Sequence, residues 1–393
     1  MAKLFIEEST LTAIGDAIRE KTEKTELLSP TAMPEEIRGI QSGGGKVVLR
    51  GDISFAFGNN GYSSASSNSY ANTGTGVKET MLKQETLYSF DTADVTNAAG
   101  VFRANNNITE VPFDINVKEG SEVDTTMICA GTGMKITKGV NINGKVKHVY
   151  YMYGGCPQLV DLRNVTGILP GDTINKINCG SCCYSCYRLR WISPELCKAI
   201  GSTKVSSSSY TTDLKEAFRY CHSLEEIIGL GVDGTMSETT PRYYYTNAFN
   251  NTFGSTYRLR RLTFETNPDG TPVVCQWRSQ TIDLSTAGSG SVKNYGFTTD
   301  TQITDDATYA ALKNHPDRWT TSKYYSSYDR TSAVETINSL PDTSAYVSQN
   351  STWSNTIKFA GGYGEKTDAG AINTMTAEEI AVATAKGWTV SFV

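Results

Sequence analysis

The chain has 393 residues, and its 36 basic and 41 acidic side chains give a formal net charge of −5, without the basic excess of a nucleic-acid-binding surface. Its 35 glycines and 21 tyrosines, with 38% hydrophobic residues, are typical of a loop- and strand-rich protein and exclude a disordered chain. No apolar run approaches the ~18 residues of a membrane span, and the first residues lack the apolar core of a secretory signal, so we expect synthesis in a cytosol and no membrane insertion.

Residues 1–41 predict a small N-terminal helical module. Leu11, Ile14 and Ile18 recur at helical spacing, and a second short helix is expected at residues 34–40. Three consecutive glycines then form a flexible joint. Because the apolar stripe of Leu11, Ile14 and Ile18 is too small to fold alone, we expect a partner chain, such as a second copy of this one, to cover it.

Residues 46–96 predict a β-rich connecting region. Apolar side chains run together at residues 47–49 and alternate at residues 53–57, which is typical of short strands. The Ser- and Asn-rich stretch that follows, as far as residue 72, is too polar to form a core.

Residues 97–280 repeat one frame. Each unit starts at an aromatic or similar residue, which we call position zero, and continues with a small residue at +3 and apolar residues at +6 and +9. The units are separated by 51, 30, 35 and 35 residues, with position zero at Phe102, Tyr153, Cys183, Phe218 and Phe253. Such repetition predicts a solenoid, because one unit cannot bury its apolar face without its neighbours.

The +3 and +6 positions of this frame give the predicted repeat core. Cysteine recurs at +3 and leucine at +6, and these positions would form two ladders through the stack of units. The predicted core residues are Cys156, Cys186, Cys221, Leu159, Leu189, Leu224 and Leu259.

Residues 281–393 predict an α/β C-terminal cap. Helix starts are expected after Thr304 and at the capping-box sequences Ser332–Glu335 and Thr376–Glu379. Strands are expected at residues 281–284, 356–359 and 389–393. The predicted fold class is therefore mainly β with short helices, as a repeat solenoid with a helical module at one end and an α/β cap at the other.

Three segments carry a resemblance to known families. Residues 217–227, with Phe218, Cys221, Leu224 and Ile227 at their offsets, closely resemble the BspA-type leucine-rich repeat. Residues 376–390 resemble the closing segment of such domains in phage structural proteins of Gram-positive gut bacteria. Residues 11–22, followed by residues 33–40, resemble an N-terminal element that is common in phage tail and baseplate proteins.

The resemblance implies a leucine-rich-repeat-like domain in a non-enzymatic bacteriophage structural protein. Such a protein would be made in the cytoplasm of the bacterial host and incorporated in the virion, as a tail fibre or baseplate-associated protein that binds the host cell surface. Its expected partners are other virion proteins, further copies of itself, and a surface glycan or protein of the host. Two alternatives stay open: a head fibre or capsid decoration protein without receptor binding, and a bacterial surface adhesin.

Tyrosines in loop-like segments are the candidate receptor contacts. Exposed tyrosines give contact area at low entropic cost and can stack on sugars or on protein. The main candidates are Tyr243, Tyr244, Tyr245, Tyr324, Tyr325 and Tyr328. Tyr184 and Tyr187 lie in a similar segment. Because tyrosines also serve as core residues, both interpretations stay open.

Four cysteines, Cys179, Cys182, Cys183 and Cys186, have the two-residue gaps of zinc ligands. The repeat frame already assigns two of them to the core, and no second knuckle follows at a longer spacing. Buried thiols are therefore favoured, zinc is the alternative, and no cofactor is expected.

We expect no enzymatic activity. His222 directly follows Cys221, but neighbouring side chains tend to point apart, so His222 is predicted to face solvent instead of activating the thiol. Glu225 and Glu226 are predicted to be solvated charges and not a pair of catalytic carboxylates.

Overall fold

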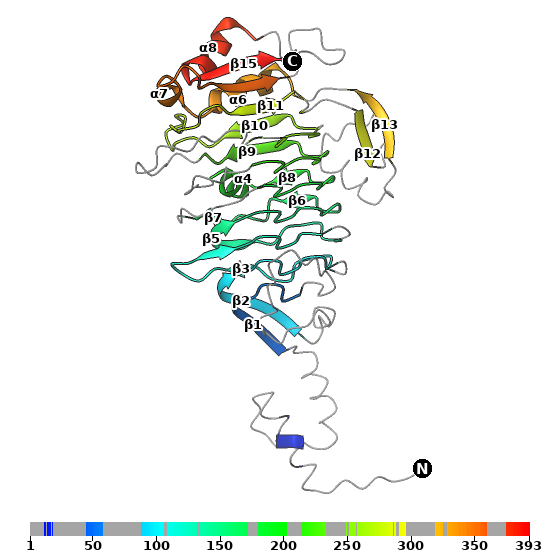
Figure 1. Ribbon diagram of the computed structural model, residues 1–393. Coiled ribbons are helices and arrows are strands. Elements are labelled where there is room, and N and C mark those ends of the chain that lie inside the picture. Colours follow the sequence, from blue (N-terminus) through cyan, green and yellow to red (C-terminus); the bar gives the residue numbers. More distant parts are fainter. Residues whose placement is uncertain are drawn as a thin grey trace.

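The computed structural model describes residues 12, 14–16, 18, 45–57, 88–105, 108–131, 134–171, 180–202, 214–232, 249, 251–256, 258–285, 287, 291–295, 319–324, 328–359 and 375–393. It is a mixed α/β structure with mostly parallel sheets, in which strands make up 28% and helices 16% of the chain. Figure 1 shows most of the labelled strands stacked above one another, from β1 near one end to β15 at the other, with β12 and β13 to one side of the stack.

The first sheet is parallel throughout. Its order is β1-β2-β4-β5-β3, and β7 also pairs with β5. The strands are β1 (Gly45–Asp52), β2 (Tyr88–Asn97), β3 (Ile115–Asn116), β4 (Glu122–Asp124), β5 (Ile142–His148) and β7 (Ile168–Pro170).

The later sheets continue this parallel pairing. β6 pairs with β8, β9 pairs with β10, and β14 lies between β11 and β15. Among the strands that the structure describes, β12 and β13 form the antiparallel pair. The bounds are β6 (Asp161–Leu162), β8 (Trp191–Ile192), β9 (Glu226–Leu230), β10 (Arg261–Phe264), β11 (Thr281–Leu284), β12 (Ser291–Tyr295), β13 (Trp319–Tyr324), β14 (Asn355–Phe359) and β15 (Trp388–Phe392).

The helices are short. They are α4 (Pro194–Gly201), α6 (Arg330–Ser339), α7 (Ser344–Val347) and α8 (Ala377–Ala385), and residues 12, 14–16 and 18 are also helical. Within the described ranges, no helix has the length and hydrophobicity that crossing a bilayer requires.

A column of backbone hydrogen bonds joins successive turns. From one turn to the next, the N–H of the residue at position zero donates to the carbonyl of the residue just before position zero of the following turn, at 2.8–3.0 Å. Four of the five predicted positions donate in this way, the last of them to Thr252, which directly precedes Phe253. Phe57 and Cys129 occupy the same place in two further turns. The region between residues 46 and 96 therefore contributes a turn of its own, and Cys129 divides the 51-residue gap.

Each turn places its backbone in the left-handed region two residues before position zero. The φ angles there lie between 50° and 62°, at Phe55, Gly100, Met127, Tyr151, Ser181, Glu216 and Asn251. This conformation is unfavourable for residues that carry a Cβ. Hydrogen bonds between turns hold it, for example from the N–H of Tyr151 to the carbonyl of Gly180 at 3.2 Å.

One hydrophobic core extends through the described chain, from Leu49 to Trp388. It includes the seven residues assigned to the repeat core, which are all completely buried: Cys156, Cys186, Cys221, Leu159, Leu189, Leu224 and Leu259.

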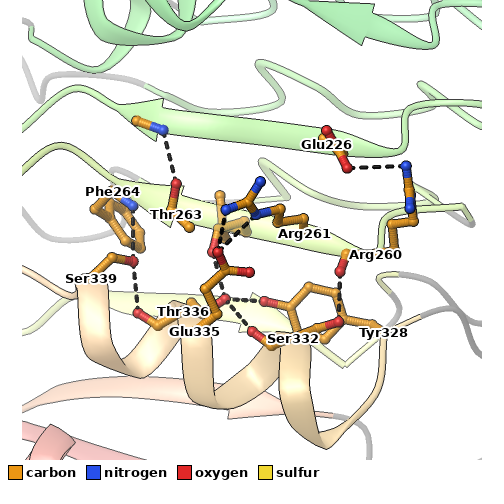
Figure 2. Close-up of polar contacts among 12 residues, drawn as sticks. Glu226, Arg260, Arg261, Thr263, Phe264, Tyr328, Ser332, Glu335, Thr336 and Ser339 are labelled. Carbon is orange, nitrogen blue, oxygen red and sulfur yellow. Dashed lines mark hydrogen bonds and ion pairs between the residues drawn. The ribbon is translucent and has the colours of Figure 1, made fainter.

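Helix α6 covers the edge of β10 that faces away from β9 (Figure 2). The hydroxyl of Ser332 donates to the carbonyl of Arg260 at 2.6 Å, and the hydroxyl of Thr336 donates to the carbonyl of Leu262 at 2.7 Å. The oxygen of Ser339 accepts from the N–H of Phe264 at 3.0 Å. The helix hydroxyls thus take the hydrogen bonds that another strand would make, and they close an edge that could otherwise pair with other chains.

The caps of the C-terminal helices differ from the sequence expectation in one place. The capping box of Thr376 and Glu379 is present at the start of α8, as predicted. Ser332 is not the N-cap of α6, because the helix begins one turn earlier, where the carboxylate of Asp329 accepts from the N–H of Ser332. The Ser332 hydroxyl is therefore available to bond β10. Thr304 lies outside the described residues.

Candidate functional site

Tyr328 is part of the core, so its prediction as a receptor contact is wrong. Its side chain is 1% exposed, and its ring stacks on Phe359 of β14 with a centroid distance of 6.2 Å. Its hydroxyl bonds Thr336 of α6, and burial raises its pKa well above the usual value. The ring fills the space between α6 and β14 and is unavailable to a ligand.

The other predicted receptor contacts lie outside the described side chains. Tyr324 ends β13, where the backbone alone is described. The remaining four are outside the described residues: Tyr243, Tyr244, Tyr245 and Tyr325.

Four other tyrosines form a row across three consecutive turns; we call Tyr150, Tyr151, Tyr184 and Tyr220 the tyrosine row. Neighbouring ring centroids are 6.1 Å apart for the first pair, 6.3 Å for the second and 5.6 Å for the third. All four side chains are partly exposed. Only Tyr184 among them belongs to a tyrosine cluster noted in the sequence, because the four tyrosines have different offsets from position zero and therefore give no periodic signal.

The backbone around the row accommodates its rings. Tyr151 and Tyr220 have φ angles of 50° and 63°, in the left-handed region. The ring of Tyr151 lies directly against Gly154, where an added Cβ would be 2.6 Å from three ring atoms. A residue larger than glycine at position 154 would displace the ring.

The charge beside the row is compensated locally. The guanidinium of Arg219 lies 4.6 Å from the ring centroid of Tyr220 and donates to its hydroxyl at 2.8 Å. The same guanidinium pairs with Glu216. Burial raises the pKa of Tyr151 to about 12, so its hydroxyl keeps its proton at physiological pH.

His222 does not face solvent, contrary to the prediction. Its ring is buried and lies 5.1 Å from the ring centroid of Tyr187 and 6.2 Å from that of Tyr220. His222 thus contacts one member of the row, Tyr220, from a buried position. Tyr187 is partly exposed and contacts His222 instead of joining the row.

Glu225 is also buried, which corrects its prediction as a solvated charge. Its carboxylate accepts from Nε of Arg190 at 2.7 Å, with exposed side-chain fractions of 7% and 3%. Both residues lie at +7 in neighbouring turns. The guanidinium of Arg190 also stacks on Trp191 at 4.4 Å. Glu226 is more exposed and pairs with Arg260 at 3.0 Å.

The cysteines at +3 make one repeated contact. The thiols of Cys156, Cys186 and Cys221 donate to the position-zero carbonyl of the preceding turn at 2.8, 3.1 and 3.0 Å. Asn105 makes the same bond, to the carbonyl of Phe57 at 2.9 Å. The +3 position therefore selects small buried donors. Burial raises the pKa of all three thiols well above the usual value.

No group of three or more candidate ligands for a metal ion occurs in the part of the chain that the structure describes. Cys182, Cys183 and Cys186 are free and buried, and Cys179 lies outside the described residues.

A groove of about 700 Å³ lies beside β4 and β5. Lys118, Lys145 and Lys147 line it together with Glu122, and Leu169 of β7 contributes a half-exposed apolar side chain. Its mixed charges favour no single ligand class.

The predicted attachment stripe is only partly available as a surface. Ile14 is 39% exposed, whereas Ile18 is 5% exposed and already buried within this chain. Leu11 lies outside the described residues.

No family model, curated protein or solved structure matches the chain.

Proposed function

We propose that the chain is a non-enzymatic bacteriophage structural protein, a tail fibre or baseplate-associated protein that binds the host cell surface. The resemblance of the repeat and of both terminal segments to phage structural proteins supports this proposal. The tyrosine row supports a binding role, because partly exposed aromatic rings are typical of recognition surfaces.

The observation that carries the proposal is the column of hydrogen bonds through the stacked turns. We infer from it a leucine-rich-repeat-like solenoid, since each turn bonds the next through the same backbone atoms and fills the same +3 and +6 positions. Such a stack presents neighbouring side chains in a fixed array, which suits the recognition of an extended surface.

Attachment to other virion proteins is assigned to residues 1–41, with Ile14 as the exposed apolar contact that the described residues offer. Assembly with further copies through the same module fits a symmetric fibre. In this arrangement the stacked turns and the C-terminal cap project from the particle toward the host.

Immunogold labelling of the phage particle tests the location. Antibodies against the purified chain should label the tail, at the fibres or the baseplate. Labelling of the head would instead support the head fibre or decoration alternative, and labelling of uninfected bacterial cells would support the adhesin alternative.

Cell binding tests the receptor role. The fluorescently labelled full chain should bind intact Gram-positive host cells saturably and reduce adsorption of the phage, whereas the same chain denatured in urea should do neither. Tail labelling without cell binding would leave a structural role and refute receptor binding.

A further inference from the structure

We propose that the tyrosine row, Tyr150, Tyr151, Tyr184 and Tyr220, binds a linear, uncharged polysaccharide of the host surface. This inference rests on the proposed host-binding function and names the class of ligand.

The shape of the row favours a chain-like ligand. The rings follow one another at 5.6–6.3 Å across three turns. A stable protein partner needs a broad patch of about 800 Å² on each side, and a file of single rings is narrow by comparison. A polysaccharide can follow such a file along its length, with sugars stacked on Tyr150, Tyr151 and Tyr184, whose rings are tilted by 31–42° to one another. The ring of Tyr220 stands at 75° to that of Tyr184 and would meet the end of the polysaccharide in a different orientation.

The chemistry of the rings suits a sugar. The face of an aromatic ring carries partial negative charge, and the C–H bonds on one face of a pyranose carry partial positive charge, so the two faces stack. The phenolic hydroxyl at the ring edge can bond the sugar hydroxyls. Tyr151 stays protonated at physiological pH and therefore remains a donor.

The charges favour an uncharged ligand. Arg219, the cation in contact with the row at Tyr220, already pairs with Glu216. An anionic polymer would have to compete with this carboxylate for the guanidinium. A neutral polymer can stack on the rings and leave the ion pair intact.

The backbone holds the rings in place. Tyr151 and Tyr220 occupy the left-handed positions that recur two residues before and two residues after position zero, and hydrogen bonds between turns fix these positions. Gly154 leaves room for the Tyr151 ring, because an added Cβ there would lie 2.6 Å from three ring atoms.

Binding to cell-wall fractions tests the proposal. The probes are the neutral polysaccharide fraction of host cell walls and, separately, the anionic teichoic acid fraction, each titrated against the full-length chain by isothermal titration calorimetry. The parent chain should bind the neutral fraction. Tyr184→Ala, in the middle of the row, should weaken this binding about tenfold or more, as for an aromatic hot spot. Tyr184→Phe keeps the ring and should stay within about threefold of the parent.

Three further variants control for folding and position. Tyr150→Ala removes an end ring and should give a smaller loss than Tyr184→Ala. Gly154→Ala keeps every ring but displaces that of Tyr151, and it should also weaken binding. Tyr346→Ala removes a partly exposed tyrosine of α7, away from the row, and should leave binding unchanged.

The outcomes separate this proposal from the host-binding function. If the parent chain binds cells and Tyr184→Ala and Tyr150→Ala bind them equally well, the tyrosine row is refuted and host binding stands. Binding of the anionic fraction alone, or loss of cell binding after protease treatment of the cells, would also overturn the proposal. If the parent chain binds no cells, host binding itself is refuted.

Discussion

Cys221 provides the most direct test of the stacked turns. Its thiol is completely buried and donates to the carbonyl of Cys183 at 3.0 Å. Cys221→Ala removes the donor and leaves a small cavity, which should lower the free energy of unfolding by about 1–2 kcal/mol. Cys221→Ser keeps a donor within reach of the same carbonyl. It should therefore cost less than the alanine variant, at about 1 kcal/mol or below.

Urea unfolding followed by circular dichroism measures these differences, provided that the dependence on urea stays the same in all variants. The serine and alanine variants of Cys156 and Cys186 should show the same order, because their thiols make the equivalent bond. If the serine variant of Cys221 is less stable than the alanine variant, its hydroxyl has no partner. The assignment of +3 as a donor position would then be incorrect.

Three further predictions concern the backbone contacts, the cap and the thiols. Gly231→Ala should lower the free energy of unfolding by about 1–3 kcal/mol, because the added Cβ would lie 2.0 Å from the carbonyl oxygen of Lys198 in α4. An unchanged free energy of unfolding in urea would contradict this close approach. Thr336→Val keeps the shape of α6 but removes the hydroxyl bonded to Leu262, at a cost of about 1–3 kcal/mol in the same assay. The buried thiols, whose folded-state pKa values are raised above the usual 9.0, should resist iodoacetamide in the native chain at pH 9. Because they ionise only after unfolding, their contribution to stability is complete below about pH 9 and is lost as the pH rises further; rapid native labelling would refute their burial.

The burial of the cysteines at +3 and the leucines at +6 could be predicted from the sequence because these side chains recur at fixed offsets. Cysteine at +3 and leucine at +6 mark the turns in which no residue is inserted. The turn of Cys129 does not match the repeat frame in the sequence, because its +6 position holds the exposed Lys135. The next residue, Ile136, is buried in place of Lys135. One inserted residue is enough to break the frame.

The turn of Phe57 was hidden for another reason. Its hydrogen-bond partner in the next turn, Val101, is more than 40 residues away in sequence, so the spacing differs from that of the later units. Loop insertions of this size add little to the cost of folding, and a repeat can therefore tolerate them while losing its period.

The tyrosine row could not be predicted because it follows no single offset. Tyr151 lies two residues before position zero of its turn, Tyr184 one residue after and Tyr220 two residues after. The rings meet only because the turns stack, and stacking determines which surface residues are neighbours. Clusters of tyrosines close together in the sequence therefore do not indicate which tyrosines are neighbours on the surface. A tyrosine of such a cluster can also be buried, as Tyr328 is.

The buried pair of Arg190 and Glu225 did leave a signal in the sequence. Arg190, Glu225 and Arg260 all lie at +7, so their charges alternate in consecutive turns. In the structure, Glu225 contacts Arg190 at 2.7 Å and Arg260 at 3.4 Å. The opposite charges at the same offset in neighbouring turns predict an ion pair for Glu225. The local sequence around Glu225, considered alone, predicts a solvated charge.

The ion pair of Arg190 and Glu225 predicts that a single variant should be less stable than the double variant that removes both charges. Arg190→Met removes the closer of the two cations from Glu225, whose side chain is 7% exposed, and should cost about 3–5 kcal/mol because a buried carboxylate loses its main partner. The double variant Arg190→Met, Glu225→Met removes both charges and should recover most of that loss, since an apolar pair of similar size is often as stable as a buried ion pair. Urea unfolding of the parent, both single variants and the double variant gives the coupling energy. A double variant no more stable than Arg190→Met would show that the arginine acts mainly through its stacking on Trp191 and not through its charge.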